Sequence, residues 1–175
     1  MRYVADLVTL RSPEPGDAEH HARWFADPEV TRTLALRYPL SPDAVAQRVA
    51  EGTRPSFADR RFTVLANDTG AAVGYTALKG ATPENRDAEL DVVLGERSLW
   101  GRGYGTAATR ATCRYGFDRV GLHRVHLWAL ADDARAVRAY ERAGFVTEGR
   151  ARDRIFKDGR WHDCLLMGLL AGELR

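Results

Sequence analysis

The clearest chemical signal in this chain is a glycine-rich segment near its middle. Three glycines alternate with other residues in the stretch Trp100-Gly101-Arg102-Gly103-Tyr104-Gly105-Thr106. Closely spaced glycines allow a turn to expose consecutive backbone N–H groups, and a helix that begins there adds the positive end of its dipole. The segment can therefore bind a pyrophosphate, although a tight strand-to-helix turn without a ligand would use the same glycines.

The glycine spacing does not match two common nucleotide-binding motifs. A Rossmann fingerprint needs a glycine three residues after Gly103, where this chain has Thr106, and it follows the first strand of a βαβ unit. A Walker loop needs Gly-Lys-Ser/Thr, and no lysine lies near. A nucleotide-dependent dehydrogenase is therefore disfavoured.

The histidines do not predict a metal site. His123 and His126 are three residues apart at the start of a predicted strand, so their side chains point to opposite faces. His20 and His21 are adjacent in a predicted helix and do not share a face either. We therefore expect no metal.

Hydrophobic periodicity and turn residues predict one sheet with helices packed on it. We expect strands over residues 3–10, 62–66, 71–78, 89–94 and 125–130, and a final hairpin that starts at residue 145 and turns at Lys157-Asp158-Gly159. Asp17, Asp27, Ser41 and the pair Asp132-Asp133 are expected to cap helices, and the glycine loop opens another helix that runs to about residue 119. No linker interrupts this order, so residues 1–175 are predicted to form a single domain of mixed α/β class.

Composition narrows the class of protein further. Hydrophobic residues make up 45% and charged residues 29% of 175 residues, the balance of a globular chain. The net charge of +2 is too small for a dedicated nucleic-acid coat, and the longest apolar run, residues 165–171, is far short of the ~20 residues that span a bilayer. Cys113 and Cys164 cannot supply a disulfide framework and are expected to be small buried hydrophobes. We expect a cytoplasmic protein that binds neither nucleic acid nor membrane directly.

Charge is unevenly distributed along the chain. Residues 1–59 hold seven basic and nine acidic side chains, whereas residues 95–175 hold fifteen basic and ten acidic ones. This difference points to the second half for an anionic ligand, although 24 of the 26 basic residues are arginine, which a compositional bias would also explain.

Two motifs together resemble the GNAT N-acetyltransferase superfamily. The family loop Gln/Arg-x-x-Gly-x-Gly/Ala matches at Gly103 and Gly105, with Trp100 in the first position, a variant similar to the ribosomal-protein-alanine N-acetyltransferase branch. That branch also carries Asn-x-x-Ala-x-x-x-Tyr-x-x-x-Gly-Phe, and this chain has the same pattern over residues 133–145 except that Asp133 replaces the Asn. The resemblance covers nearly the whole chain. It implies the acyl-CoA N-acyltransferase fold, in which a mostly antiparallel sheet contains two splayed parallel strands.

The resemblance implies acetyl-CoA as co-substrate and places it between the strands at 89–94 and 125–130. In this family the first of these strands pairs with pantetheine, which implicates Val92, Val93 and Leu94. The loop from Arg102 to Thr106 would hold the pyrophosphate, with Arg102 and Arg142 as additional phosphate contacts. Trp100 and Gly101 are expected to bind the cofactor as well. Ala136 and Asp133 lie in the second motif. Aspartate can accept a hydrogen bond but cannot donate one, so the cofactor contact at position 133 is expected to be altered.

The resemblance also implies roles in catalysis. A family tyrosine that protonates the leaving thiolate corresponds to Tyr140, which could equally be a core aromatic because it shares a helical face with Val137. Some members carry a glutamate base where this chain has Trp128. Glu89 and Asp91 are the remaining candidates for a base. They alternate with apolar residues and so lie on one strand face. Two solvated acids at the start of a strand would show the same pattern. Many family members use water in place of a dedicated base.

The acceptor is expected to be a primary amine. A protein N-terminus of the ribosomal-protein type is favoured by the resemblance, and an amino sugar, an aminoglycoside or a polyamine is the alternative. A non-catalytic acyl-CoA sensor also stays open, because of Trp128 and Asp133. A homodimer is possible by analogy with the family, and Trp161 could lie in the core, in the acceptor cleft or in a dimer seam.

Overall fold

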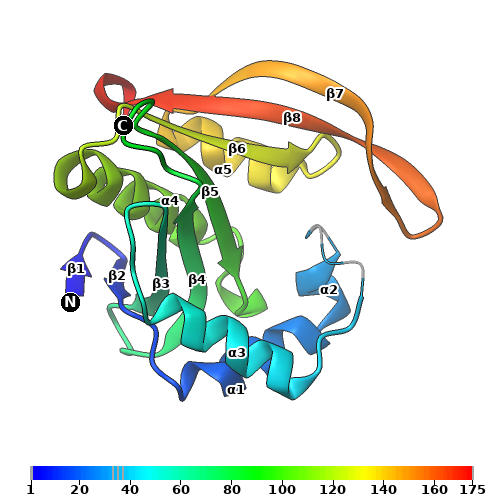
Figure 1. The fold of residues 1–175 in the computed structure, drawn as a ribbon. Coiled ribbons are helices and arrows are strands. Elements are labelled where there is room, and N and C mark those ends of the chain that lie inside the picture. The colour runs from blue at the N-terminus through cyan, green and yellow to red at the C-terminus, as the bar shows by residue number, and fades with distance from the viewer. Residues whose placement is uncertain (1, 33, 35, 37, 175) are drawn as a thin grey trace.

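Eight strands form one mixed sheet in the computed structural model, which describes residues 2–32, 34, 36 and 38–174 (Figure 1). The strand order across the sheet is β1-β2-β3-β4-β5-β6-β8-β7. The strands are β1 (Arg2–Val4), β2 (Val8–Arg11), β3 (Asp59–Ala66), β4 (Ala72–Lys79), β5 (Asp87–Leu94), β6 (Arg124–Leu130), β7 (Val146–Lys157) and β8 (Arg160–Leu170). The helices are α1 (Asp17–Ala26), α2 (Pro28–Thr31), α3 (Pro42–Gly52), α4 (Tyr104–Tyr115) and α5 (Ala134–Ala143), with short turns η1 (Arg97–Leu99), η2 (Gly116–Val120) and η3 (Ala171–Glu173).

The prediction of one strand over residues 3–10 is wrong, because this segment is a hairpin of β1 and β2. The turn between them is held from outside the segment. The side-chain amide of Asn67 donates to the carbonyls of Ala5, at 2.7 Å, and Asp6, at 2.9 Å. The turn therefore depends on a residue in the β3–β4 loop.

The prediction that Asp17 caps α1 is also wrong. Gly16 is the N-cap residue, and Asp17 is buried with its carboxylate turned toward the sheet. The carboxylate accepts from Arg11 Nη2 at 2.7 Å and from the Thr63 hydroxyl at 2.6 Å. Asp17 therefore forms an ion pair with Arg11 of β2 and does not cap the helix.

The other predicted caps are confirmed. Asp27 accepts from the Glu29 N–H at the start of α2, and Ser41 accepts from the Ala44 N–H at the start of α3. Asp133 accepts from the Ala136 N–H at 3.1 Å, and Gly144 ends α5 with a φ of 108°. In both α2 and α3 a proline follows the cap, where its missing N–H costs no hydrogen bond.

The middle and C-terminal elements follow the predicted order. β3 and β4 form the expected antiparallel hairpin, and β7 and β8 form the long final one. The helix predicted to reach residue 119 is α-helical only to Tyr115 and continues as the π-helical turn η2. Gly121 then ends the turn with a φ of 75°. Cys113 and Cys164 are both buried, as expected.

Among the residues that the structure describes, one pair of neighbouring strands is parallel, and it separates after three residues. β5 pairs with β6 from Asp87↔Arg124 to Glu89↔His126, whereas every other pair in the sheet is antiparallel. Beyond Glu89 the two strands diverge, and Figure 1 shows the sheet opening between them. The expected fold, a mostly antiparallel sheet with one splayed parallel pair, is confirmed.

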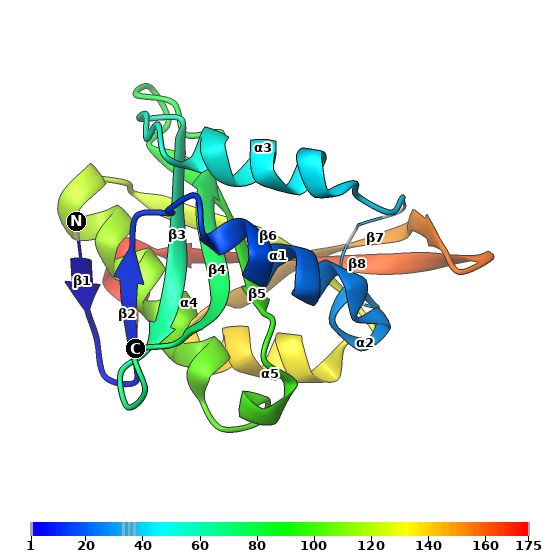
Figure 2. The same cartoon turned by 90° about the horizontal axis from the view of Figure 1, so that it is seen from below.

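Helices cover both faces of the sheet (Figure 2). On one face α4 buries Tyr104, Ala108 and Ala111 against β2 and β3. On the opposite face α1 buries Trp24 among Tyr75 of β4 and Val93 of β5. Alternation along β5 therefore divides its residues between the two helical layers.

The β7–β8 hairpin extends beyond the rest of the sheet and reaches the segment that follows α1 (Figures 1 and 2). Lys157 at its tip donates to the carbonyls of Thr31 and Leu34, the latter at 2.8 Å. Phe156 and Trp161 are exposed beside it, with ring centroids 5.2 Å apart. Trp161 therefore does not lie in the core. Within the described ranges, none of the helices combines the length and apolarity needed to cross a membrane.

Candidate active site

The separation of β5 from β6 creates a cleft of about 650 Å³. One side is β5 with the loop that follows it, and the other side is β6 with α5. Fourteen of the sixteen predicted site residues line it, namely Glu89, Asp91, Val92, Val93, Leu94, Trp100, Gly101, Gly103, Gly105, Thr106, Asp133, Ala136, Tyr140 and Arg142. Residues that are far apart in the sequence thus meet in one cleft.

The glycine loop shapes one end of the cleft through its backbone. Gly101 and Gly103 have φ values of 77° and 91°, which residues with a Cβ rarely adopt. Gly103 is also the N-cap of α4, so the first-turn N–H groups of the helix are available to a ligand. The Trp100 indole donates to the Leu94 carbonyl at 2.9 Å and ties the loop to the end of β5.

Arginines of α5 add positive charge near this loop. The Arg135 guanidinium lies over the Trp100 ring, 3.7 Å from the centroid. Arg138 and Arg142 line the same cleft three and seven residues further along the helix, where successive turns share a face. The loop end of the cleft therefore combines backbone donors, a helix N-terminus and three cations.

Two predicted residues do not line the cleft. The Tyr104 side chain is buried in the core under α4, and its hydroxyl donates to Asp68 at 3.3 Å. Arg102 is exposed at the tip of the loop. Of these two residues, Tyr104 can offer the cleft only its backbone N–H.

The edge of β5 beside the cleft has free pairing positions. Because β6 leaves after Glu89, residues 90–94 of β5 form no ladder with it. Val92, Val93 and Leu94 line the opening. An extended ligand with amide groups can pair with this stretch as a further strand would.

Tyr140 of α5 lines the cleft and also packs against the core, with its ring centroid 6.0 Å from that of Phe145. Burial raises the pKa of its phenol well above the usual value, and the negative charges of Asp133 and Asp91 raise it further. The phenol therefore remains protonated at neutral pH. It can donate a proton but does not act as a base.

Glu89 and Asp91 lie on the same face of β5 but differ in their partners. Asp91 forms an ion pair with Lys79 Nζ at 2.6 Å. Within residues 2–32, 34, 36 and 38–174, Glu89 has no ion-pair partner. Of the two carboxylates, Glu89 is therefore the freer to accept a proton.

Trp128 lines the cleft from β6. The Arg154 guanidinium lies over its ring, 3.9 Å from the centroid. Cys164 and Ile155 line the cleft from β8 and β7. Burial raises the pKa of the Cys164 thiol, so this cysteine is not activated as a nucleophile. No group of three or more His, Cys, Asp or Glu side chains in the described part of the chain could hold a metal ion.

Several cleft residues were expected only as part of a range, because the family resemblance implies an acceptor site built from residues 24–50 and 150–162. Phe25, Val30, Leu34 and Leu36 come from the segment that begins in α1, and Arg48 comes from α3. No motif marks these residues, because only the docking of α1 and α3 against the sheet brings them to the cleft. The one signal in the sequence is that Phe25, Val30, Leu34 and Leu36 are apolar.

Comparisons with known proteins agree with this geometry. A family model described as an acetyltransferase (GNAT) domain matches residues 8–146. YdaF of Bacillus subtilis (strain 168), which carries the name of a ribosomal N-acetyltransferase, is 30% identical over 175 residues, 97% of this chain and 94% of the relative. A spermidine N(1)-acetyltransferase of Vibrio cholerae is 28% identical over 116 residues, 66% of each chain.

A solved structure shows the same fold. The crystal structure of spermidine N-acetyltransferase from Vibrio cholerae in complex with CoA and spermine superimposes with a TM-score of 0.86 at 24% identity, and the match covers 95% of this chain and 97% of that one. The family match spans most of the chain, and the match to YdaF spans 97% of it. The chain therefore belongs to the GNAT family of N-acetyltransferases.

Proposed function

We propose that this enzyme transfers the acetyl group of acetyl-CoA to the N-terminal amine of a protein or peptide. The observation that carries the proposal is that β5 separates from β6 beside the glycine loop from which α4 begins. This arrangement leaves a strand edge for an amide-bearing chain and a set of N–H donors for phosphates within one cleft.

The cleft fits CoA in size and in chemistry. The pyrophosphate would lie on the N–H groups of Gly103 to Thr106, and Arg142 would add a charge-assisted contact. Pantetheine would pair with Val92 to Leu94 and pass Asp133 and Ala136. A volume of about 650 Å³ accommodates a ligand of this length.

Acetyl transfer requires two proton movements. The neutral amine attacks the thioester carbonyl carbon, a C–N bond forms, and the C–S bond then breaks to release the thiolate. Tyr140 donates its proton to that sulfur and is reprotonated from solvent. The amine loses its proton to Glu89, directly or through a water molecule, whereas Asp91 is held by Lys79.

The charge at the acceptor end favours an amine with one positive charge. The carboxylate of Asp91 is paired with Lys79 there. Within the described residues Glu89 has no ion-pair partner, and Leu34, Leu36 and other apolar side chains line the same cleft. A polyamine carries several positive charges and would need an excess of carboxylates. A peptide N-terminus needs one carboxylate and an apolar wall.

An acceptor panel tests the proposal. Release of CoA thiol would be followed with acetyl-CoA and peptides, spermidine, spermine, or amino sugars, under one set of conditions. We expect saturable turnover with peptides at a kcat/KM at least about tenfold above that of any polyamine. Turnover confined to polyamines or amino sugars would overturn the peptide assignment, and binding of CoA without turnover of any acceptor would favour a sensor.

A further inference from the structure

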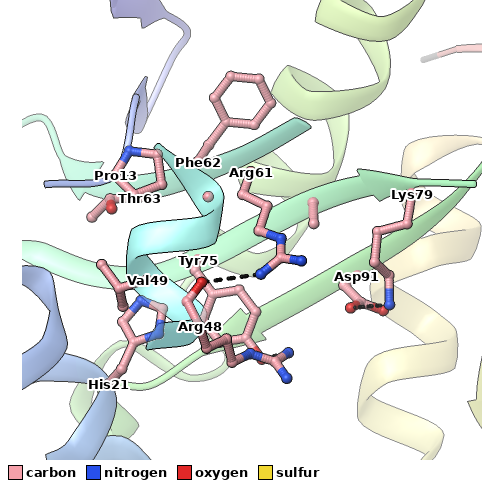
Figure 3. Close-up of a pocket in the computed structure, with 12 residues that line it drawn as sticks. Pro13, His21, Arg48, Val49, Arg61, Phe62, Thr63, Tyr75, Lys79 and Asp91 are labelled. Carbon is pink, nitrogen blue, oxygen red and sulfur yellow. Dashed lines mark hydrogen bonds and ion pairs between the residues drawn. The ribbon is translucent and has the colours of Figure 1, made fainter. Parts of the chain in front are cut away.

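A second, smaller cavity opens beside the acceptor end of the cleft (Figure 3). Its volume is about 130 Å³, and it lies between α1, α3 and the face of β3, β4 and β5. Arg48, Tyr75, Lys79 and Asp91 line both cavities. The two cavities are therefore neighbours that meet at these four side chains.

The register of β4 against β5 relates the positions of the two cavities. Lys79 is opposite Glu89, Ala77 is opposite Asp91, and Tyr75 is opposite Val93. Successive residues on one face of a strand are about 7 Å apart. The smaller cavity therefore begins at Asp91, about 7 Å along β5 from Glu89. A similar distance separates the N-terminal amine of a peptide from the side chain of its first or second residue.

Arg48, Arg61 and Lys79 are the cations that line this cavity in the described part of the chain, and two of them already have carboxylate partners. Arg61 donates to Asp59 through Nε and Nη2, the latter at 2.8 Å, and its Nη1 donates to the Arg48 carbonyl at 3.0 Å. Lys79 is paired with Asp91 at 2.6 Å. Neither side chain has a positive charge to spare for a ligand.

Arg48 is different. Its guanidinium lies beside the rings of Phe25 and Tyr75, 5.8 and 5.7 Å from their centroids, and donates to the Tyr75 hydroxyl at 3.4 Å. Over residues 2–32, 34, 36 and 38–174, it has no carboxylate within ion-pair distance. Figure 3 shows this guanidinium beside the Tyr75 ring and apart from the ion pair of Asp91 and Lys79. The cavity thus keeps one uncompensated positive charge.

His21 gives a second, independent sign of a missing polar ligand. Its side chain is only 6% exposed and stacks on Tyr75 at 4.8 Å, yet neither ring nitrogen has a hydrogen-bond partner in the described structure. Burial lowers the pKa of His21 to about 4, so the ring is neutral at pH 7 and one nitrogen is an N–H donor. Buried polar groups without partners are rare and are commonly completed by a ligand or water.

We propose that the small cavity is a subsite for a carboxylate carried by the acceptor, bound by Arg48 with Tyr75 and His21 as neutral polar partners. This inference rests on the proposed function and narrows the class of acceptor. The preferred acceptor is a peptide whose N-terminal amine is followed by an acidic residue. A free amino acid would present the same carboxylate chemistry from a different source.

A matched pair of peptides tests the subsite. The peptides differ only at the second residue, Asp in one and Asn in the other, so they differ in charge and hardly in shape. Hydrogen bonds to charged groups are strong enough for a preference of at least about tenfold in kcat/KM for the Asp peptide. Free aspartate serves as a further acceptor and identifies the source of the carboxylate.

Two variants connect the preference to the cavity. Arg48→Gln removes the charge, and we expect the Asp/Asn ratio to fall to near one. His21→Phe keeps the stacked ring without its nitrogens and is expected to lower the ratio less. Arg54→Gln makes the same chemical change on an exposed arginine just after α3, and the ratio should stay at the wild-type value.

The outcomes separate the two proposals. A wild-type ratio near one, or an unchanged ratio in Arg48→Gln, overturns the subsite while peptide acetylation stands. If neither peptide is acetylated, the proposed function fails, and binding of N-acetyl-aspartate amide then decides the subsite by calorimetry. Binding at least about tenfold weaker in Arg48→Gln supports it, and equal binding overturns it.

Discussion

Replacing Tyr140 by phenylalanine removes the proposed proton donor and little else. The side chain packs between the cleft and the core around Phe145, and phenylalanine preserves that packing. In the described part of the chain, no hydrogen bond to the Tyr140 hydroxyl is present. The variant should therefore lose less than about 1 kcal/mol of unfolding free energy.

The effect on catalysis should be much larger. Positioned general acids contribute about 10²- to 10⁴-fold, so we expect kcat to fall by at least about 100-fold. Since burial and the nearby Asp133 and Asp91 raise the pKa of Tyr140, the phenol is already fully protonated at pH 7. The wild-type rate should consequently show no decline from loss of this proton below about pH 10.

The assay measures thiol release at saturating acetyl-CoA, with CoA affinity determined separately by calorimetry. Tyr115→Phe is the matched control, because Tyr115 is a partly buried helical tyrosine that packs against Phe62 outside the cleft. We expect Tyr140→Phe to bind CoA normally and turn over slowly, and Tyr115→Phe to retain wild-type turnover.

Two results would refute this reasoning. Turnover within about threefold of wild type in Tyr140→Phe would show that the thiolate leaves without a proton from Tyr140. A parallel loss of CoA binding and of thermal stability would show that the residue is structural. A sensor that binds acyl-CoA without chemistry would be unaffected by the change.

Three further changes have defined outcomes. Gly105→Ala should keep or slightly raise the melting temperature, because a Cβ there meets no atom within 4 Å. The affinity for CoA, measured by calorimetry, should fall about tenfold. An unchanged affinity would show that the loop does not bind CoA. Asp17→Asn should cost about 3–5 kcal/mol in urea unfolding, because Arg11 loses its buried partner. Burial alone would raise the pKa of the Asp17 carboxyl, but hydrogen bonds from Arg11 and Thr63 outweigh burial and lower it. The stability that Asp17 contributes to the wild type is therefore present above about pH 4 and is lost as the pH falls through the lowered pKa of the folded state. Equal stability of the wild type at about pH 3 and pH 7 would contradict this. Glu89→Gln should lower kcat/KM for the amine by about tenfold or more with CoA affinity unchanged, and wild-type kinetics would point to water as the proton acceptor.

Features whose chemistry is complete within a few residues could be predicted from the sequence. Asp27 and Ser41 cap helices because each side chain reaches an N–H two or three residues ahead. The glycine loop follows the same logic, since positive φ at Gly101 and Gly103 is a local property. The long final hairpin was predicted from the turn at residues 157–159 and the extended residues around it.

Features that depend on distant partners could not be predicted in this way. Asp17 has the residue type of a cap, but its carboxylate accepts hydrogen bonds from Arg11 and Thr63 instead of from the N-terminus of α1. The sequence of residues 3–10 resembles one continuous strand, because the turn within it is stabilised by Asn67, which is distant in the sequence. The separation of β5 from β6 was known only from the family resemblance, because no residue in either strand marks where pairing ends.

The acceptor side of the cleft was the least predictable part of the site. His21, Arg48 and Tyr75 belong to three different elements and carry no motif. They meet because α1 and α3 cross the same face of the sheet. Their proximity is a product of tertiary packing, and the carboxylate subsite could be inferred only from the structure.

The central claim is that one cleft holds acetyl-CoA and delivers its acetyl group to a peptide N-terminus. Incubating the enzyme with acetyl-CoA and a peptide that contains an internal lysine tests this claim most directly, with thiol release and fragment masses recorded together. We predict one acetyl group for each thiol released, located on the N-terminal amine and absent from the lysine. Acetylation of the lysine instead, or thiol release without any acetylated peptide, would contradict the account.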